Sequence, residues 1–174
     1  MTQDDNSGLI GAYPVCATCQ TSAIVRDAWA TWNHMTGTWE LQAVFDQVRC
    51  ETCNQETELT WVVDKAFRTK RIRRLNDAFR RGEVLHGSIV ITEGIRALGD
   101  DILPRIVALV SEFGAFSEDN DPHGEHDFGA LHHQDQKIFW KIDYFDRDLK
   151  YHSPDAANPE VTCRVLTVML ASEY

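Results

Sequence analysis

The stretch from Asn120 to Asp148, NDPHGEHDFGALHHQDQKIFWKIDYFDRD, decides how the C-terminal half of this chain is expected to fold. Residues 137–144 alternate in character, which places Ile138, Trp140 and Ile142 on one face of a strand. The stretch opens on Asn-Asp-Pro, which favours a turn, and a shorter alternating segment leads into the strand. The pattern predicts a β-hairpin that carries a loop of charged side chains.

The loop ahead of this hairpin gathers imidazoles and carboxylates, and no lysine or arginine lies between Asp119 and Asp135. A divalent cation binds such donors and offsets their charge. We hypothesise a second divalent metal here, with candidate ligands Asp121, His123, Glu125, His126 and Asp127. Within that set Glu125, His126 and Asp127 are candidate catalytic residues, as metal ligands or as a general base. The alternative is a purely structural turn with solvated charges.

Composition places the chain among globular proteins, since 43% of its 174 residues are hydrophobic and 25% are charged. Apolar runs such as Ile89–Ile91 are too short to cross a membrane. Residues 1–7 are polar and acidic, unlike a signal peptide. We therefore expect a cytoplasmic protein of two small domains with no membrane contact, whose oligomeric state the sequence leaves open.

Four of the five cysteines form two CxxC pairs, Cys16/Cys19 and Cys50/Cys53, with 30 residues between them. Four thiolates complete the tetrahedral shell that Zn²⁺ prefers, which predicts one structural zinc per chain. Iron in the same shell and a redox-active CxxC are the alternatives. The segments 24–32 and 38–46 alternate around a turn, and 58–63 is a third candidate strand. Residues 13–63 are therefore predicted to form a zinc ribbon, whose four tryptophans we expect to lie mostly in its core.

A basic segment follows the ribbon. Residues 64–81 hold eight basic and two acidic side chains, although the whole chain has a net charge of −10. The apolar spacing of Ile72, Leu75 and Phe79 predicts an amphipathic helix over 64–82 that joins the two parts. A local basic face can bind nucleic acid even in an acidic protein. The candidate nucleic-acid-binding residues are Arg71, Arg73, Arg74 and Arg80. The alternative is a solvated face, or one paired with acidic side chains of the second half.

Residues 69–174 are predicted to form a compact second domain. A short strand at 89–91 and a helix from about residue 102 to Gly114 precede the hairpin. Asn158-Pro159 is a typical helix start, so we expect a buried helix from there through Ala171. The predicted class is α+β, with an N-terminal zinc ribbon of small antiparallel sheet followed by a βαββα-like domain.

Several motifs of this second domain resemble an uncharacterised bacterial family that is common on plasmids and integrated elements of alphaproteobacteria. They are Leu75–Ala78 (LNDA), Thr92–Ile95 (TEGI), Asn120–Gly129 (NDPHGEHDFG), Phe139–Tyr144 (FWKIDY) and Thr162–Tyr174 (TCRVLTVMLASEY). The chain departs from the family's WKIDYYD pattern at Phe145. Separately, Pro14–Glu58 resembles small zinc-ribbon proteins of the same genomes. The resemblance implies a bacterial, mobile-element setting and one fold from Thr69 to Tyr174, but no reaction.

Three functions are compatible with these features. The first is a zinc-stabilised accessory protein that binds nucleic acid or a nucleoprotein partner through the ribbon and the arginine helix. The second is a metal-dependent hydrolase or nuclease centred on the turn His123–Asp127. The third is an acidic inhibitor that mimics nucleic acid and blocks a host defence complex.

Overall fold

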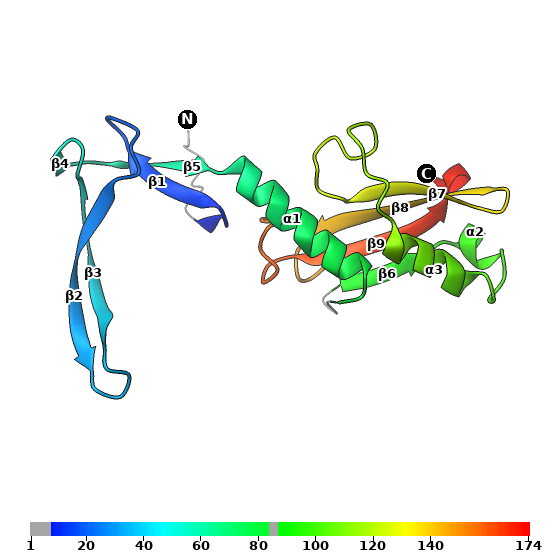
Figure 1. The fold of residues 1–174 in the computed structure, drawn as a ribbon, viewed down its shortest axis with the longest axis horizontal. Helices are drawn as coiled ribbons and strands as arrows, with labels where there is room; N and C mark the ends of the chain where they lie inside the picture. Colours follow the sequence, from blue (N-terminus) through cyan, green and yellow to red (C-terminus); the bar gives the residue numbers. More distant parts are fainter. Residues whose placement is uncertain (1–7, 84–86) are drawn as a thin grey trace. The chain divides into compact units, whose positions relative to one another are not determined.

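The computed structural model describes residues 8–83 and 87–174. The chain divides into two compact units, which we call the ribbon unit (Met1–Asp64) and the sheet unit (Lys65–Tyr174) (Figure 1). In the described part of the chain the α-helices lie in the sheet unit, and both units contain strands. The expected α+β class is confirmed.

The ribbon unit is made of antiparallel strands. β1 (Ala12–Cys16) pairs with β5 (Leu59–Val63). β2 (Ile24–Asn33) and β3 (Thr38–Cys50) form a long hairpin, and the end of β3 pairs with the two-residue β4 (Gln55–Glu56). The small N-terminal antiparallel sheet is therefore confirmed, with the third predicted strand paired to β1 and not to the hairpin.

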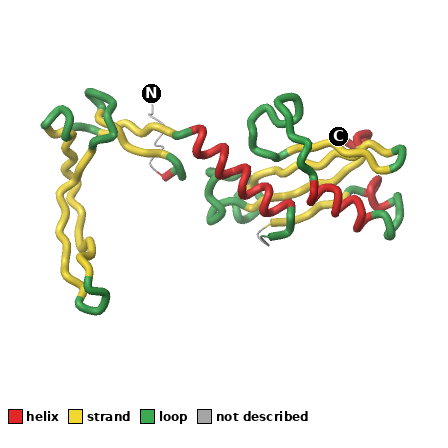
Figure 2. The backbone as a smooth tube through the Cα atoms, in the orientation of Figure 1, coloured by secondary structure: helices red, strands yellow, loops and turns green. Residues whose placement is uncertain are grey.

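The β2–β3 hairpin is a two-stranded ribbon over most of its length (Figure 2). At its turn the side-chain oxygen of Asn33 accepts the backbone N–H of Met35 at 2.9 Å, and Gly37 takes φ +67°. Trp29, Trp32 and Trp39 are 64%, 52% and 69% exposed. The prediction that most tryptophans of the ribbon lie in its core is wrong, because a two-stranded ribbon offers them no second layer to pack against.

The sheet unit begins with α1 (Lys65–Arg80), the predicted amphipathic helix. It buries Ile72, Asn76 and Phe79, and ends at Gly82, which takes φ +73°. The N–H groups of Gly82 and Glu83 bond back to the carbonyls of Phe79 and Ala78, so the helix has a glycine C-cap.

A four-stranded sheet in the order β6-β9-β8-β7 forms the rest of this unit. β6 (Gly87–Ile91) runs parallel to β9 (Cys163–Leu170), while β8 (Gln136–Phe145) is antiparallel to both β9 and β7 (Phe128–His133). α2 (Glu93–Arg96) and α3 (Leu103–Glu112) lie between β6 and β7 in the chain. The predicted hairpin is thus β7–β8.

The core of the sheet unit lies between one face of the sheet and two helices. β8 contributes Ile138, Trp140 and Ile142, and the facing residues of β9 are Leu166 and Val168. The helices cover them with Phe79 of α1 and with Ile106 and Val110 of α3 (Figure 1). Period-two alternation along β8 therefore places its apolar side chains in one contiguous core.

The segment after Asn158 corrects one prediction. Instead of a buried helix from 158 to 171, residues 158–162 turn and β9 follows. β9 has a strand on each side, and such a central strand shows the continuous apolar, β-branched run that we interpreted as a helix buried on all sides. The predicted βαββα order is therefore wrong in its last element, which is a strand in the middle of the sheet.

The C-terminal residues are hydrogen-bonded to the segment that follows β6. A short 3₁₀ turn, Ala171–Glu173, follows β9, and the Glu173 carboxylate accepts the Thr92 hydroxyl at 2.7 Å. The same carboxylate accepts the N–H groups of Gly94 and Leu170 at 3.0 and 2.8 Å. These contacts lower the pKa of Glu173, the Thr92 bond first among them. Separately, no helix in the described ranges is long and apolar enough to cross a membrane.

Candidate functional site

The four paired cysteines come together in the ribbon unit. Cys16 and Cys50 end β1 and β3 and are fully buried, while Cys19 and Cys53 lie in the following turns. Their sulfur atoms all lie within 4.8 Å of one another. The Sγ–Sγ distances are 3.9 Å for Cys16–Cys53 and 3.7 Å for Cys19–Cys50. Four sulfurs at about 2.3 Å from a tetrahedral zinc are about 3.8 Å apart, so the cluster is positioned to hold a metal ion and fits zinc.

The two CxxC turns share one local geometry. Gln20 and Asn54, which directly follow the second cysteine of each pair, take φ of +59° and +55°. Backbone N–H groups point at the first sulfur of each pair, from Thr18 to Cys16 and from Cys53 to Cys50, both at 3.4 Å. Such N–H donors stabilise thiolates, so the backbone prepares the cluster for a cation.

Electrostatics within the cluster also favour a cation. The Thr57 hydroxyl, 3.2 Å from the Cys16 sulfur, is the main cause that lowers the pKa of Cys16 to about 6. The hydrogen bond with Cys19 is the main cause that raises the pKa of Cys53 to about 12. A metal ion binds all four sulfurs as thiolates. Its positive charge at the centre of the cluster would offset the resistance of the Cys53 thiol to losing its proton.

In the charged turn of the sheet unit, side chains that the metal hypothesis assigned to a cation bond to other groups of the protein. Asp121 is buried, and its Oδ1 accepts the N–H groups of Glu125 and His126 at 2.8 and 3.1 Å. His126 takes φ +55°, and its ring stacks on Phe116 with centroids 3.6 Å apart. Its Nδ1 lies 3.0 Å from Asp77 of α1. Asp121 and His126 therefore hold the turn together and fasten it to the helix.

The other three candidates do not converge on one point as metal ligands do. Glu125 accepts the Tyr144 hydroxyl at 3.2 Å, Asp127 is half-buried, and His123 is exposed. In the described ranges the four cysteines are the group whose donor atoms converge as metal ligands do, and the turn is not such a group. The second metal at Asp121, His123, Glu125, His126 and Asp127 is not supported.

Two carboxyls of the turn nevertheless have perturbed acidity. Burial is the largest cause that raises the pKa of Glu125, and burial likewise raises the pKa of Asp127. Asp127 lines a cavity of about 480 Å³ together with His123, Lys141 and Tyr174. Perturbed carboxyls in cavities are common at functional sites, and also in structural networks.

Beneath the turn lies a buried polar network that sequence reasoning missed. Asn76 of α1 donates to the Glu125 carbonyl at 2.8 Å and to the Tyr144 hydroxyl at 2.7 Å. Its own oxygen accepts Arg164 Nε of β9 at 2.9 Å, and Arg164 also donates to the Ala156 carbonyl at 2.7 Å. Burial raises the pKa of Tyr144 and lowers the pKa of Arg164. One indication of this network is present in the sequence, because Asn76 is a polar residue within the apolar stripe of a predicted helix.

The arginines of the basic helix divide into two groups. Arg80 is 5% exposed, pairs with Asp77 at 3.0 Å and donates to the carbonyls of Val110 and Ser111. Its guanidinium also lies over the rings of Phe116 and Trp140. Arg73 donates to the Gly124 carbonyl at 2.6 Å, which fastens the turn to the helix. The nucleic-acid role predicted for Arg80 is therefore corrected to a structural one, since its charge is buried.

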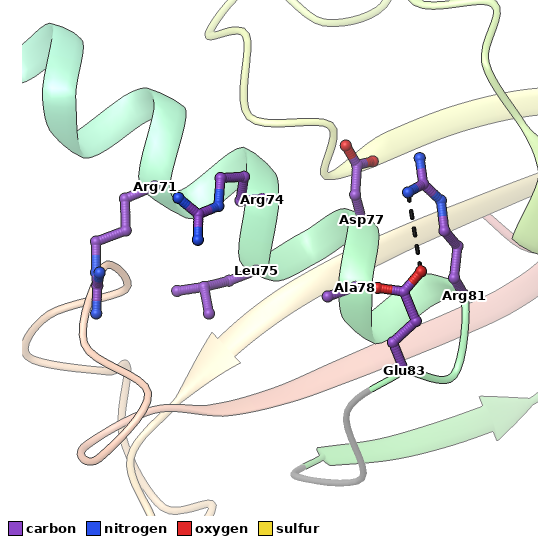
Figure 3. Close-up of a pocket in the computed structure, with 7 residues that line it drawn as sticks. All are labelled: Arg71, Arg74, Leu75, Asp77, Ala78, Arg81 and Glu83. Atoms are coloured by element: carbon purple, nitrogen blue, oxygen red, sulfur yellow. Dashed lines mark ion pairs between the residues drawn. The ribbon is translucent and has the colours of Figure 1, made fainter.

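The other cations of this basic segment differ in exposure. Arg68 pairs with the buried carboxylate of Asp155 at 2.9 Å. Arg74 is exposed, as are Lys70 and Arg81, whereas Arg71 is half-buried and donates to the Ala157 carbonyl at 2.7 Å. Arg71, Arg74 and Arg81 line a cavity of about 480 Å³ together with Asp77 and Glu83. Figure 3 shows these side chains in order along α1, with the Arg81–Glu83 ion pair of 3.9 Å at its end. We call Lys70, Arg71, Arg74 and Arg81 the basic face.

Comparison with known proteins places only the C-terminal part. Residues 91–173 match the family described as Protein of unknown function (DUF3768). The match spans just under half of the chain and lies wholly within the sheet unit. No curated protein and no solved structure matches the chain. The C-terminal part is thus similar to an uncharacterised family, as its motifs led us to expect.

Proposed function

We propose that this protein is a zinc-stabilised accessory protein of bacterial mobile elements that binds nucleic acid through the basic face of α1. The observation that carries the proposal is the cavity lined by Arg71, Arg74 and Arg81 on one helix. Guanidinium groups bind phosphate oxygens through paired hydrogen bonds. In this proposal the protein acts in the reducing cytoplasm, where thiolates remain available to zinc.

The spacing of the exposed cations supports this assignment. Lys70, Arg74 and Arg81 recur at intervals of four and seven residues, which places them on one face of the helix. The opposite face carries Ile72 and Phe79 into the core. Asp77 lies in the same cavity, but His126 and Arg80 share its charge and hydrogen bonds. The basic face therefore keeps a net positive charge.

The ribbon has a smaller part in nucleic-acid binding than its tryptophans first indicate. The first 64 residues hold two arginines, no lysine and nine carboxylates. Phosphates would be repelled there, because nucleic-acid affinity rests largely on cations that replace counterions. We therefore assign phosphate contacts to the basic face and leave the ribbon out of them.

The test is fluorescence anisotropy of the full chain with labelled single-stranded and double-stranded DNA and RNA, over a range of salt. Replacing Lys70, Arg74 and Arg81 with alanine should reduce the log–log salt slope by about one per lost contact, whatever the sequence. Replacing Arg96, Arg105 and Lys150 is the matched control, since it removes one lysine and two arginines from other exposed positions. No binding by the wild type at low salt, or equal losses in both triple variants, would overturn the proposal.

A hydrolase centred on the turn is a second candidate, favoured by one observation. Asp127 has a raised pKa and lines a cavity beside His123, which suits a general acid or base. Its support is weaker because Asp121 and His126 already serve the turn's own structure. The nucleic-acid mimic draws on the acidic residues on either side of the basic segment, and the basic face opposes it.

A further inference from the structure

Near its turn, the β2–β3 hairpin has one face made of apolar, exposed side chains. Ala28 pairs with Val44, Ala30 with Leu41, and Trp32 with Trp39. Paired residues point to the same side of a hairpin, and residues two apart on a regular strand share that side, as Ala28, Ala30 and Trp32 do on β2. On β3 a register shift at Gln42 brings Val44 opposite Ala28, so Val44 joins Leu41 on this side although the two are three positions apart. The six side chains therefore form one charge-free stripe, which we call the apolar face. Its larger members Trp32, Trp39, Leu41 and Val44 are 52–69% exposed.

The hairpin's other face differs. Trp29 precedes Ala30 and points the opposite way, where its ring packs edge-on against Phe45 with centroids 5.2 Å apart. Glu40 also lies on that side, paired with Thr31. Between the pairs Ala28/Val44 and Trp32/Trp39 the hairpin thus has one face without charge and one face with a carboxylate.

The exposed apolar area is enough for a stable interface. The exposed parts of Trp32, Trp39, Leu41 and Val44 amount to on the order of 500 Å². Somewhat more than half of a protein interface is apolar, so this area corresponds to about 800 Å² per chain, the usual size for a specific complex.

The stripe is also complementary to itself. Its large pair is Trp32 and Trp39. On β2, Ala30 and Ala28 lie two and four positions from Trp32, and on β3, Leu41 and Val44 lie two and five positions from Trp39 because the register shifts between Trp29 and Ala30. If two hairpins pack face to face in opposite directions about Ala30 and Leu41, each tryptophan pair lies over the smaller Ala28 and Val44 of the other copy. Such reciprocal contacts are those of a two-fold symmetric interface. The absence of charge on this face favours self-association, because a charged side chain here would lie close to the same charged side chain of the second copy. The chain as a whole already has a net charge of −10.

We propose that the apolar face of the β2–β3 hairpin is the interface of a symmetric homodimer of this chain. The occupant is a second copy, because the stripe complements itself in size and carries no charge that would call for an oppositely charged partner. Nucleic acid fits poorly, since the first 64 residues hold nine carboxylates against two arginines. Binding to another protein becomes an outcome of the test.

Sedimentation velocity of the full-length zinc-loaded protein between about 1 and 100 µM decides the question. The expected species has twice the chain mass of 19.8 kDa. Replacing Trp32 and Trp39 with alanine should weaken the dimer at least about 100-fold, since buried tryptophans dominate interface energies. Trp29→Ala is the matched control, as an equally exposed tryptophan on the other face, and should leave the dimer intact.

A second variant separates dimer loss from misfolding. Leu41→Lys changes a side chain that is 69% exposed, so folding and zinc content should persist while two like charges meet at the dimer axis. A wild type that sediments as a monomer throughout would overturn the proposal and leave the face to another protein. A dimer that survives Leu41→Lys, or one that Trp29→Ala abolishes, would overturn it too.

Discussion

Among residues 8–64 three side chains are buried, Val15, Cys16 and Cys50, whereas in the sheet unit nine buried apolar side chains form one contiguous cluster. Two of the three buried residues in the ribbon are candidate metal ligands, and three of its four tryptophans are exposed. Small folds without a sufficient core need a metal or a cross-link. The sheet unit is thus stabilised by packing, and the ribbon unit has in its place a four-cysteine cluster positioned to hold a metal ion. We therefore expect metal removal to unfold the ribbon unit and core substitutions to destabilise the sheet unit.

Loss of the metal should have the largest effect, confined to the ribbon unit. Cys50→Ser removes one of four thiolates, and structural zinc contributes on the order of 10 kcal/mol of folding free energy. Residues 13–63 should then exchange backbone hydrogens freely, while residues 65–174 stay protected. Hydrogen exchange followed by mass spectrometry measures both. Cys163→Ser in β9 should keep the ribbon protected, and a wild type that elemental analysis finds free of zinc and iron would refute the metal centre.

Asn76→Ala should produce the next largest effect, in the opposite unit. The change removes partners from the Glu125 carbonyl, the Tyr144 hydroxyl and buried Arg164. Leaving a buried charge without its partner costs about 3–5 kcal/mol. Urea unfolding monitored by near-ultraviolet circular dichroism gives the loss, and zinc content should not change.

Asn158→Ala is its control, since that side chain accepts one exposed N–H and should cost at most about 1 kcal/mol. Equal losses in the two variants would show that the network contributes nothing special.

Gly129→Ala should have an intermediate effect through packing alone. A Cβ at Gly129 would lie 2.6 Å from the ring of Trp140, which is fully buried and cannot move aside. Overpacking of this kind costs about 1–3 kcal/mol. The melting temperature of the sheet unit should fall, whereas Gly114→Ala, which has 4.0 Å of room, should leave it unchanged. A stable Gly129→Ala protein would mean that the core is looser than its close contacts indicate.

The smallest expected effect is on the pH dependence of stability, which should differ in sign between the two units. Burial raises the pKa of Asp127, so its ionised form destabilises the folded state at neutral pH. Asp127→Asn should therefore raise the melting temperature of the sheet unit at pH 7. That gain should vanish as the pH falls below the ordinary aspartate pKa of about 3.9.

The ribbon should respond to acid with the opposite sign, because protons compete with zinc for the thiolates and its stability is lost as the pH falls. Calorimetry of wild type and variant at several pH values tests both signs. An Asp127→Asn protein that melts lower at pH 7 would indicate that the carboxylate makes a contact worth more than its burial costs.

The metal centre could be predicted from sequence because its ligands and their spacing are local. Each CxxC turn brings its own two sulfurs together, and only the meeting of the two turns depends on the fold. The hairpin β7–β8 was equally accessible, since period-two alternation and a short turn decide it within about twenty residues.

The central strand β9 was not accessible by such reasoning. Leu166 and Val168 are compatible with a buried helix or a buried strand, and the choice depends on β6, more than seventy residues earlier. The error also concealed Arg164, because its partner Asn76 lies 88 positions away. The exposure of Trp32 and Trp39 was not predicted, because β-propensity indicates that a strand forms but does not indicate whether a second layer of structure packs against it.

β9 also fixes when the sheet unit can fold during synthesis. Ribosomes add about 5–20 residues per second, and domains generally fold from the N-terminus onward, so the ribbon is complete roughly 5–20 seconds before β9 has been made. During that interval β6 and β8 lack the strand that lies between them, and their open edges can pair with other chains. If the ribbon binds zinc as we expect, zinc supply decides when the ribbon folds. Protection of the sheet unit from aggregation then depends on how quickly β9 inserts between β6 and β8.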